Sequence, residues 1–167
     1  MTQPPFTLDE PLVRDVPPFA GLAAAARLTM PQIPIFAERA STDLMRLADA
    51  HRLPLVDDPV FIYSGAGTGP HDLFTLQVAL PVDPDHPAVV AFQPTDDHAV
   101  KRFDAFRCFA AGYHGPMTHL GDAYAPLMNA LRDAGHTPLE QSREVYRRWV
   151  AYDAPDNHVE IQLGIRP

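Results

Sequence analysis

The feature that most constrains the fold of this chain is an internal duplication. Three blocks recur in the same order, roughly half the chain apart: LMRLADAHRLPL at 44–55 and LMNALRDAGHTPL at 127–139, VFIY at 60–63 and REVY at 143–146, and LQVAL at 76–80 and IQLGI at 161–165. Each pair alone is short enough to arise by coincidence. Their common order indicates that one structural unit occurs twice.

Each copy predicts a helix followed by two strands. The second helix has an apolar face at helical spacing, formed by Leu120, Tyr124, Leu127, Met128 and Leu131. Gly135 supplies a stop for this helix. The first helix is expected over residues 40–52, with Ser41 or Thr42 as its cap.

The strands are predicted from runs of β-branched and aromatic residues between turn signals, over residues 59–64, 73–80, 143–150 and 158–165. Residues 65–70 and 153–157 are rich in turn-forming residues and connect each pair of strands as a hairpin. A further strand is expected before each helix, over residues 102–112 and 22–29. The alanines of residues 22–29 favour a helix. The strand there is therefore predicted only from the corresponding position in the second repeat.

These elements predict an α+β fold in which a βαββ unit is duplicated, with antiparallel sheets, two helices and a central ligand cleft. The two units are expected to pair about a pseudo-twofold axis. Residues 1–19 read as an extended proline-rich leader. Residues 20–167 read as a single domain, with repeat one at about 20–82 and repeat two at about 100–167.

The composition disfavours several classes of function. A net charge of −8 argues against direct nucleic-acid binding, because affinity for phosphate depends on clustered Lys and Arg. The single cysteine, Cys108, allows no intrachain disulfide. The chain has no pattern typical of a secretion signal, and its apolar runs are too short to span a membrane. We therefore expect a cytoplasmic protein without membrane contact, whose exposed hairpin edges would allow a homodimer.

Glu144 is the residue that the duplication singles out, because its counterpart in the first repeat is the apolar Phe61. On a strand, Glu144 and Tyr146 point to the same face. If that face is buried, the carboxylate lies in apolar surroundings, where a cationic ligand would stabilise it. The alternative is a carboxylate on an edge strand that is either exposed to solvent or paired with Arg148.

Several of these segments resemble the gyrase-inhibitor-like effector-binding domains, over approximately residues 22–165. The resemblance rests on the FIY run, the strand ending in Ala79-Leu80-Pro81, the GYHG turn at 112–115, and the REVY and EIQL strands. It implies a cleft that binds amphipathic, often cationic, compounds through a key glutamate. Such domains occur attached to AraC-type or MerR-type DNA-binding segments or alone, and the short leader favours the stand-alone form.

The resemblance leaves three functions open. The first is binding or sequestration of a lipophilic cation or drug-like molecule, with no cofactor. The second is a cofactor-free hydrolase that opens cyclopropane-type electrophilic toxins, with Glu144 and Tyr146 as catalytic residues. The third is a protein-interaction module that inhibits a target such as gyrase.

The predicted ligand-binding residues are one acid and a set of aromatic side chains: Glu144, Tyr146, Tyr63, Phe61, Phe106, Tyr113 and Trp149. Phe74, Phe103 and Tyr124 are further candidates for the walls of the cleft. Of the eight histidines, His114 and His119 have i, i+5 spacing and the other six are scattered through expected turns; none of them forms a metal-binding motif, so we expect no metal site. Cys108, beside two phenylalanines, is expected to be a small buried residue.

Overall fold

The chain folds into two compact units. The computed structural model describes residues 4–65 and 69–167. The repeat-one unit is Pro17–Ala105, and the repeat-two unit combines Met1–Val16 with Phe106–Pro167. Of the connection expected at residues 65–70, residues 66–68 lie outside the described residues.

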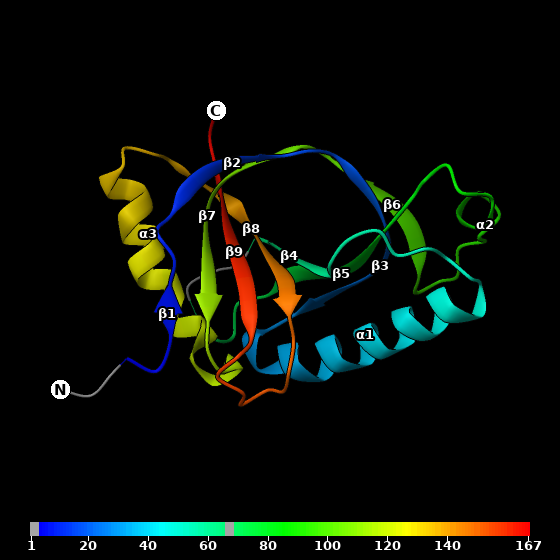
Figure 1. The fold of residues 1–167 in the computed structure, drawn as a ribbon, viewed down its shortest axis with the longest axis horizontal. Helices are drawn as coiled ribbons and strands as arrows, with labels where there is room; N and C mark the ends of the chain where they lie inside the picture. The colour runs from blue at the N-terminus through cyan, green and yellow to red at the C-terminus, as the bar shows by residue number, and fades with distance from the viewer. Residues whose placement is uncertain (1–3, 66–68) are drawn as a thin grey trace. The chain divides into compact units, whose positions relative to one another are not determined.

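The repeat-one unit contains a βαββ sequence of elements followed by a short extension (Figure 1). Its elements are β3 (Phe19–Leu28), the 3-10 turn η1 (Met30–Gln32), α1 (Ile33–Ala50), β4 (Val60–Ser64), β5 (Phe74–Val82), α2 (Pro87–Val90) and β6 (Ala99–Phe103). The strands are antiparallel in the order β6-β3-β5-β4. Helix α1 packs against β3 and β5.

The repeat-two unit contains the second βαββ sequence and two strands from the N-terminus. Its elements are β1 (Thr7–Leu8), β2 (Leu12–Val16), β7 (Phe106–His114), the 3-10 helix η2 (Met117–Ala123), α3 (Tyr124–Asp133), β8 (Pro138–Arg148) and β9 (His158–Ile165). Strands β7, β9 and β8 are antiparallel neighbours in that order, and β1 and β2 both pair with the other edge of β7.

The α+β class and the duplicated βαββ unit are therefore confirmed. Both expected hairpins are present, as β4 with β5 and β8 with β9. Strand β3 forms despite its run of alanines, because it pairs with β5 on one side and with β6 on the other. Alanine has the highest helix propensity of all residues, but propensity differences are small per residue, and pairing along both edges outweighs them. Gly135 ends α3 with a positive φ of 84°, as the helix stop predicts.

Several expected boundaries are wrong, among them the start of β8, which lies at Pro138 rather than at residue 143. Helix α1 begins at Ile33, with a proline in its first turn, so Ser41 and Thr42 lie inside the helix rather than at its cap. The strand expected over residues 102–112 is divided into β6 and β7, because β6 pairs with β3 whereas β7 pairs with β9. The leader segment contributes β1 and β2 to the repeat-two unit.

The hairpin registers refine the alignment of the two repeats. Phe61 lies opposite Val78, and its counterpart Glu144 lies opposite Ile161. Val78 is therefore the structural counterpart of Ile161, two residues from the alignment expected from sequence. A shift of two residues keeps each side chain on its original face, so the pattern of buried positions survives it.

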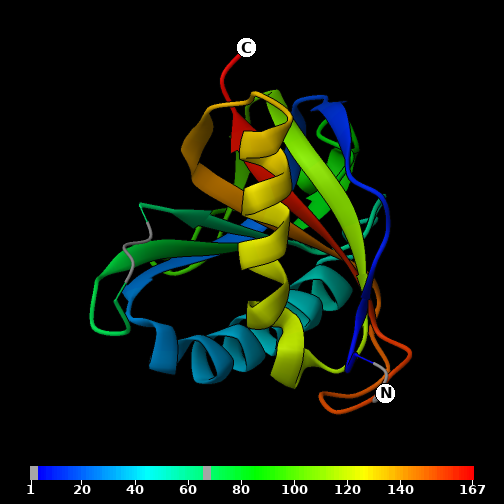
Figure 2. The ribbon, with the colours of Figure 1, turned by 90° about the vertical axis from the view of Figure 1, so that its left-hand side faces the viewer.

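The two faces of the repeat-two sheet differ sharply. On one face, which we call the helix face, α3 packs on β7 and β9 around Leu127, Leu131, Ile161 and Leu163 (Figure 2). The opposite face carries Phe106, Cys108 and Ala110 of β7, with Val16 packed against them. Among the described residues, none of the helices is both long and apolar enough to cross a membrane.

Gly164 of β9 marks a point where a side chain does not fit. A Cβ atom there would lie 2.7 Å from the backbone oxygen of Gln141 and 3.0 Å from the ring of Phe106. We predict that Gly164→Ala lowers the free energy of unfolding by about 1–3 kcal/mol, the usual cost of overpacking. Thermal or urea unfolding measures this. Gly121→Ala is the matched control, because nothing lies within 4 Å of that position, and equal stabilities of the two variants would contradict the prediction.

Candidate functional site

Glu144 lies on the helix face of β8, and its side chain is buried. The residue is 3% exposed, although carboxylates are almost never fully buried without partners. The alternation of β8 places Tyr146 on the same face, as expected from sequence. The prediction of an exposed edge-strand carboxylate is therefore wrong.

Two phenol groups donate hydrogen bonds to the Glu144 carboxylate. The hydroxyl of Tyr124, on α3, donates to Oε2 at 2.6 Å. The hydroxyl of Tyr146, on β8, donates to Oε1 at 3.0 Å. Each oxygen is thus oriented by one tyrosine, and the bond from Tyr124 links α3 to β8.

The pKa of Tyr124 reflects both the burial of the site and the negative charge of Glu144. Burial raises this pKa well above its ordinary value of 10, and the neighbouring Glu144 carboxylate raises it further. A phenolate beside a carboxylate would bring two negative charges together in a desolvated site. Tyr124 therefore remains a hydrogen-bond donor throughout the physiological pH range.

Arg148 is separated from Glu144 by a β-bulge. Tyr146 lies opposite Val159 and Arg148 lies opposite His158, so Arg147 is an additional residue on β8. Val159 belongs to the core beneath α3, and the adjacent His158 points to the opposite face. The bulge therefore places Arg148 away from the helix face, which rules out the expected Arg148 partnership for Glu144.

The structure places the remaining predicted site residues in different surroundings. Trp149 is 55% exposed, and its ring meets that of Tyr146 edge-on at 6.3 Å between centroids. Phe106 lies on the opposite face, where the Arg143 guanidinium stacks on its ring at 4.1 Å. Tyr113 is fully buried in the core beneath α3, and its hydroxyl donates to the Pro116 carbonyl.

Phe61 and Tyr63 lie on β4 of the repeat-one unit. Phe61 is buried, whereas Tyr63 is half-buried and its ring lies 6.0 Å from that of Phe74. Within the repeat-two unit, the structure brings together Glu144, Tyr146 and Trp149. It adds Tyr124, which the sequence marked as a wall candidate and as part of the apolar helix face.

The expected role of Cys108 is confirmed. The residue is fully buried, and burial raises the pKa of its thiol to about 11, with a smaller contribution from Glu160. A thiol that stays protonated is a poor nucleophile. Cys108 therefore acts as a small core residue.

A pocket of about 370 Å³ lies elsewhere in the repeat-two unit. It is lined by the ends of β7 and β9 and by the turn between β8 and β9, through His114, Arg148, Pro155, Asp156, Asn157 and His158. Neither Glu144 nor Tyr146 is among these residues. This pocket is thus distinct from the glutamate–tyrosine cluster, which we define as Glu144, Tyr124 and Tyr146.

Comparison with solved structures identifies the fold. The C-terminal domain of EcmrR superimposes with a TM-score of 0.72 at 16% identity, covering 94% of this chain and 97% of that domain. SAV2435, solved bound to tetraphenylphosphonium, gives a TM-score of 0.68 at 10% identity, covering 95% of this chain and 94% of that protein. The chain has the gyrase-inhibitor-like effector-binding fold.

Other comparisons show that the same fold occurs in a hydrolase and that the chain matches only part of the full EcmrR chain. A hydrolase from Listeria innocua shares the gyrase-inhibitor-like fold with a TM-score of 0.67 at 13% identity, over 94% of this chain and 92% of that one. In the EcmrR–DNA complex, the chain spans only 57% of the EcmrR chain, with a TM-score of 0.76 at 14% identity over 96% of this chain. The sequence matches no protein-family model and no curated protein.

We predict that Tyr124→Phe destabilises the protein by about 1–3 kcal/mol, because it removes a hydrogen bond to a buried charged group. Urea unfolding at neutral pH measures the loss. Tyr152→Phe is the matched control, since Tyr152 is exposed. If both variants unfold at the same urea concentration, the bond to Glu144 contributes nothing to stability.

The raised pKa of Tyr124 also predicts alkaline destabilisation. Above pH 10 the unfolded chain loses the phenolic proton while the folded chain retains it, so stability falls as the pH rises through this window. Part of this fall should disappear in Tyr124→Phe. Unfolding curves between pH 9 and about pH 11 test it, and equal slopes in the two proteins would contradict the assignment.

Proposed function

We propose that the chain binds amphipathic cationic small molecules, with Glu144 as the anionic group that recognises them. The observation that carries the proposal is a buried carboxylate whose two oxygens are each oriented by a phenol. The shared fold supports it, because SAV2435 was solved with tetraphenylphosphonium, a lipophilic cation.

The physical reason is the strength of charge interactions at a desolvated carboxylate. Attraction between opposite charges grows as the local dielectric constant falls. Tyr124 and Tyr146 hold the carboxylate in place, so little reorganisation is needed when a cation arrives. A phosphonium ion has no N–H group, so its attraction to Glu144 depends on charge rather than on a directed hydrogen bond.

Aromatic side chains beside the carboxylate supply the second part of the recognition. The ring of Tyr146, whose hydroxyl donates to Glu144, lies edge-on to the ring of Trp149. Aromatic faces attract cations and contribute apolar contact area. An acid combined with aromatic rings therefore selects molecules that are both lipophilic and positively charged.

Titration with tetraphenylphosphonium tests the proposal. We expect Glu144→Gln to weaken binding by about tenfold or more, equivalent to about 1.4 kcal/mol, because it removes the charge and retains the shape. Glu140→Gln is the matched control, since Glu140 is an exposed acid on the same strand. Isothermal titration calorimetry gives the affinities.

A neutral ligand of similar size, triphenylphosphine oxide, separates charge from apolar contact. It should bind the native protein and Glu144→Gln equally. If tetraphenylphosphonium does not bind, or binds Glu144→Gln as tightly as the native protein, Glu144 is not the recognition residue.

A second candidate function is hydrolysis of cyclopropane-type electrophiles, supported by the fold shared with a hydrolase. Glu144 would accept a proton from a water molecule as the water oxygen bonds to a ring carbon, the strained C–C bond would break, and Tyr146 would donate a proton to the leaving group. Mass spectrometry of such an alkylating agent after incubation with the protein decides between the functions. Turnover abolished in Glu144→Gln supports catalysis, whereas an unaltered agent leaves binding alone.

A further inference from the structure

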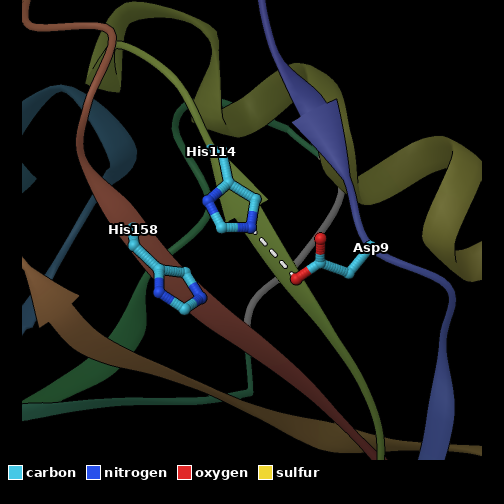
Figure 3. Close-up of side chains that lie close together, drawn as sticks. All are labelled: Asp9, His114 and His158. Atoms are coloured by element: carbon cyan, nitrogen blue, oxygen red, sulfur yellow. Dashed lines mark hydrogen bonds and ion pairs between the residues drawn. The ribbon is translucent and has the colours of Figure 1, made fainter.

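Three neighbouring strands of the repeat-two unit bring Asp9, His114 and His158 together. His114 on β7 and His158 on β9 are cross-strand partners, and their rings stack with centroids 4.4 Å apart. Asp9 follows β1 directly, and its backbone N–H donates to the Gly112 carbonyl at 2.8 Å. The side chains of Asp9, His114 and His158 therefore lie close together on one face of the sheet (Figure 3).

The potential ligand atoms converge closely. His114 Nε2 lies 3.0 Å from Asp9 Oδ2, and one ligand atom from each residue lies within 4.8 Å of the other two. In a tetrahedral zinc site, bonds of about 2.0–2.1 Å place ligand atoms roughly 3.3 Å apart. The cluster is therefore near the required spacing, and small side-chain rotations would complete it.

Gly112 makes this convergence possible. A Cβ atom at this position would lie 2.2 Å from Asp9 Oδ2 and 3.0 Å from His158 Nε2. Contacts under 3.0 Å do not occur for real side chains, so any other residue would displace the aspartate. Because Gly112 has no side chain, the Asp9 carboxylate and the His158 imidazole can lie directly over its backbone.

We propose that Asp9, His114 and His158 form a binding site for a divalent cation of the zinc class. Two imidazoles and one carboxylate form a donor set that zinc and related late transition metals favour. This site is separate from the proposed cation-binding function, because it lies on the face of the sheet opposite Glu144.

The surroundings allow an ion to reach the site. Asp9 is exposed, the two histidines are half-buried, and both histidines also line the pocket of about 370 Å³. The side of the ion that faces this pocket would remain open to water or to a further ligand, as in zinc sites with three protein ligands. Arg148 also lines the pocket and opposes a cation there, whereas Asp9 and Asp156 favour one.

The protonation states are consistent with metal binding. Burial lowers the pKa of His158, and the adjacent His114 lowers it as well. A neutral imidazole has a lone pair that can bind a metal ion.

Zinc titration of the tag-free protein, by competition with a chromophoric chelator, tests the proposal. We expect one zinc ion per chain, and about a tenfold or greater loss of affinity in His114→Ala, His158→Ala and Asp9→Asn. Gly112→Ala should weaken binding although it keeps all three ligands. His71→Ala is the control, because His71 is exposed and lies outside the cluster.

A direct readout accompanies the affinities. Zinc should shift the imidazole 15N resonances of His114 and His158 and leave those of His71 unchanged. If zinc does not bind, or binds with the same affinity when His114 or His158 is replaced, the proposal is overturned. Tetraphenylphosphonium binding should persist in these variants, so failure of the zinc site and failure of the proposed function are distinguishable.

Discussion

The buried Glu144 carboxylate is the constraint around which the repeat-two unit is arranged. Removing an ionised carboxylate from water is costly unless hydrogen bonds replace its hydration. Here Tyr124 and Tyr146 provide such bonds from a helix and from the same strand. Helix α3 must therefore dock in the one position along the sheet at which the Tyr124 hydroxyl reaches the Glu144 carboxylate. Apolar packing alone would tolerate sliding of the helix, whereas a bond between a phenol and a buried acid fixes its position.

Strand alternation then separates two kinds of chemistry within one sheet. Glu144 lies on the face covered by α3, whereas His114 and His158 lie on the other. The bulge after Tyr146 reinforces this separation, because it transfers Arg148 to the histidine face. Without the bulge, alternation would place Arg148 on the helix face together with Glu144, the residue that we propose as the recognition group for a cationic ligand.

The duplication made the class and the order of elements predictable, because each copy supports the interpretation of the other. Glu144 and Tyr146 could be found as the place where one repeat is acidic and the other apolar. Phe106 could not be assigned to a face, since the break between β6 and β7 depends on strand pairing. The histidine cluster was missed for a similar reason. His114 and His158 are far apart in the sequence and meet only through the β7–β9 register, and Asp9 joins them only because the leader pairs with β7.

We propose that a lipophilic cation binds against the glutamate–tyrosine cluster. Intermolecular nuclear Overhauser effects between tetraphenylphosphonium and the protein test it most directly, because they report which rings the ligand touches. We expect contacts from the phosphonium phenyl protons to the ring protons of Tyr146 and Tyr124. Contacts confined to His158 and Pro155, which line the separate pocket, or no contacts at a saturating ligand concentration, would contradict it.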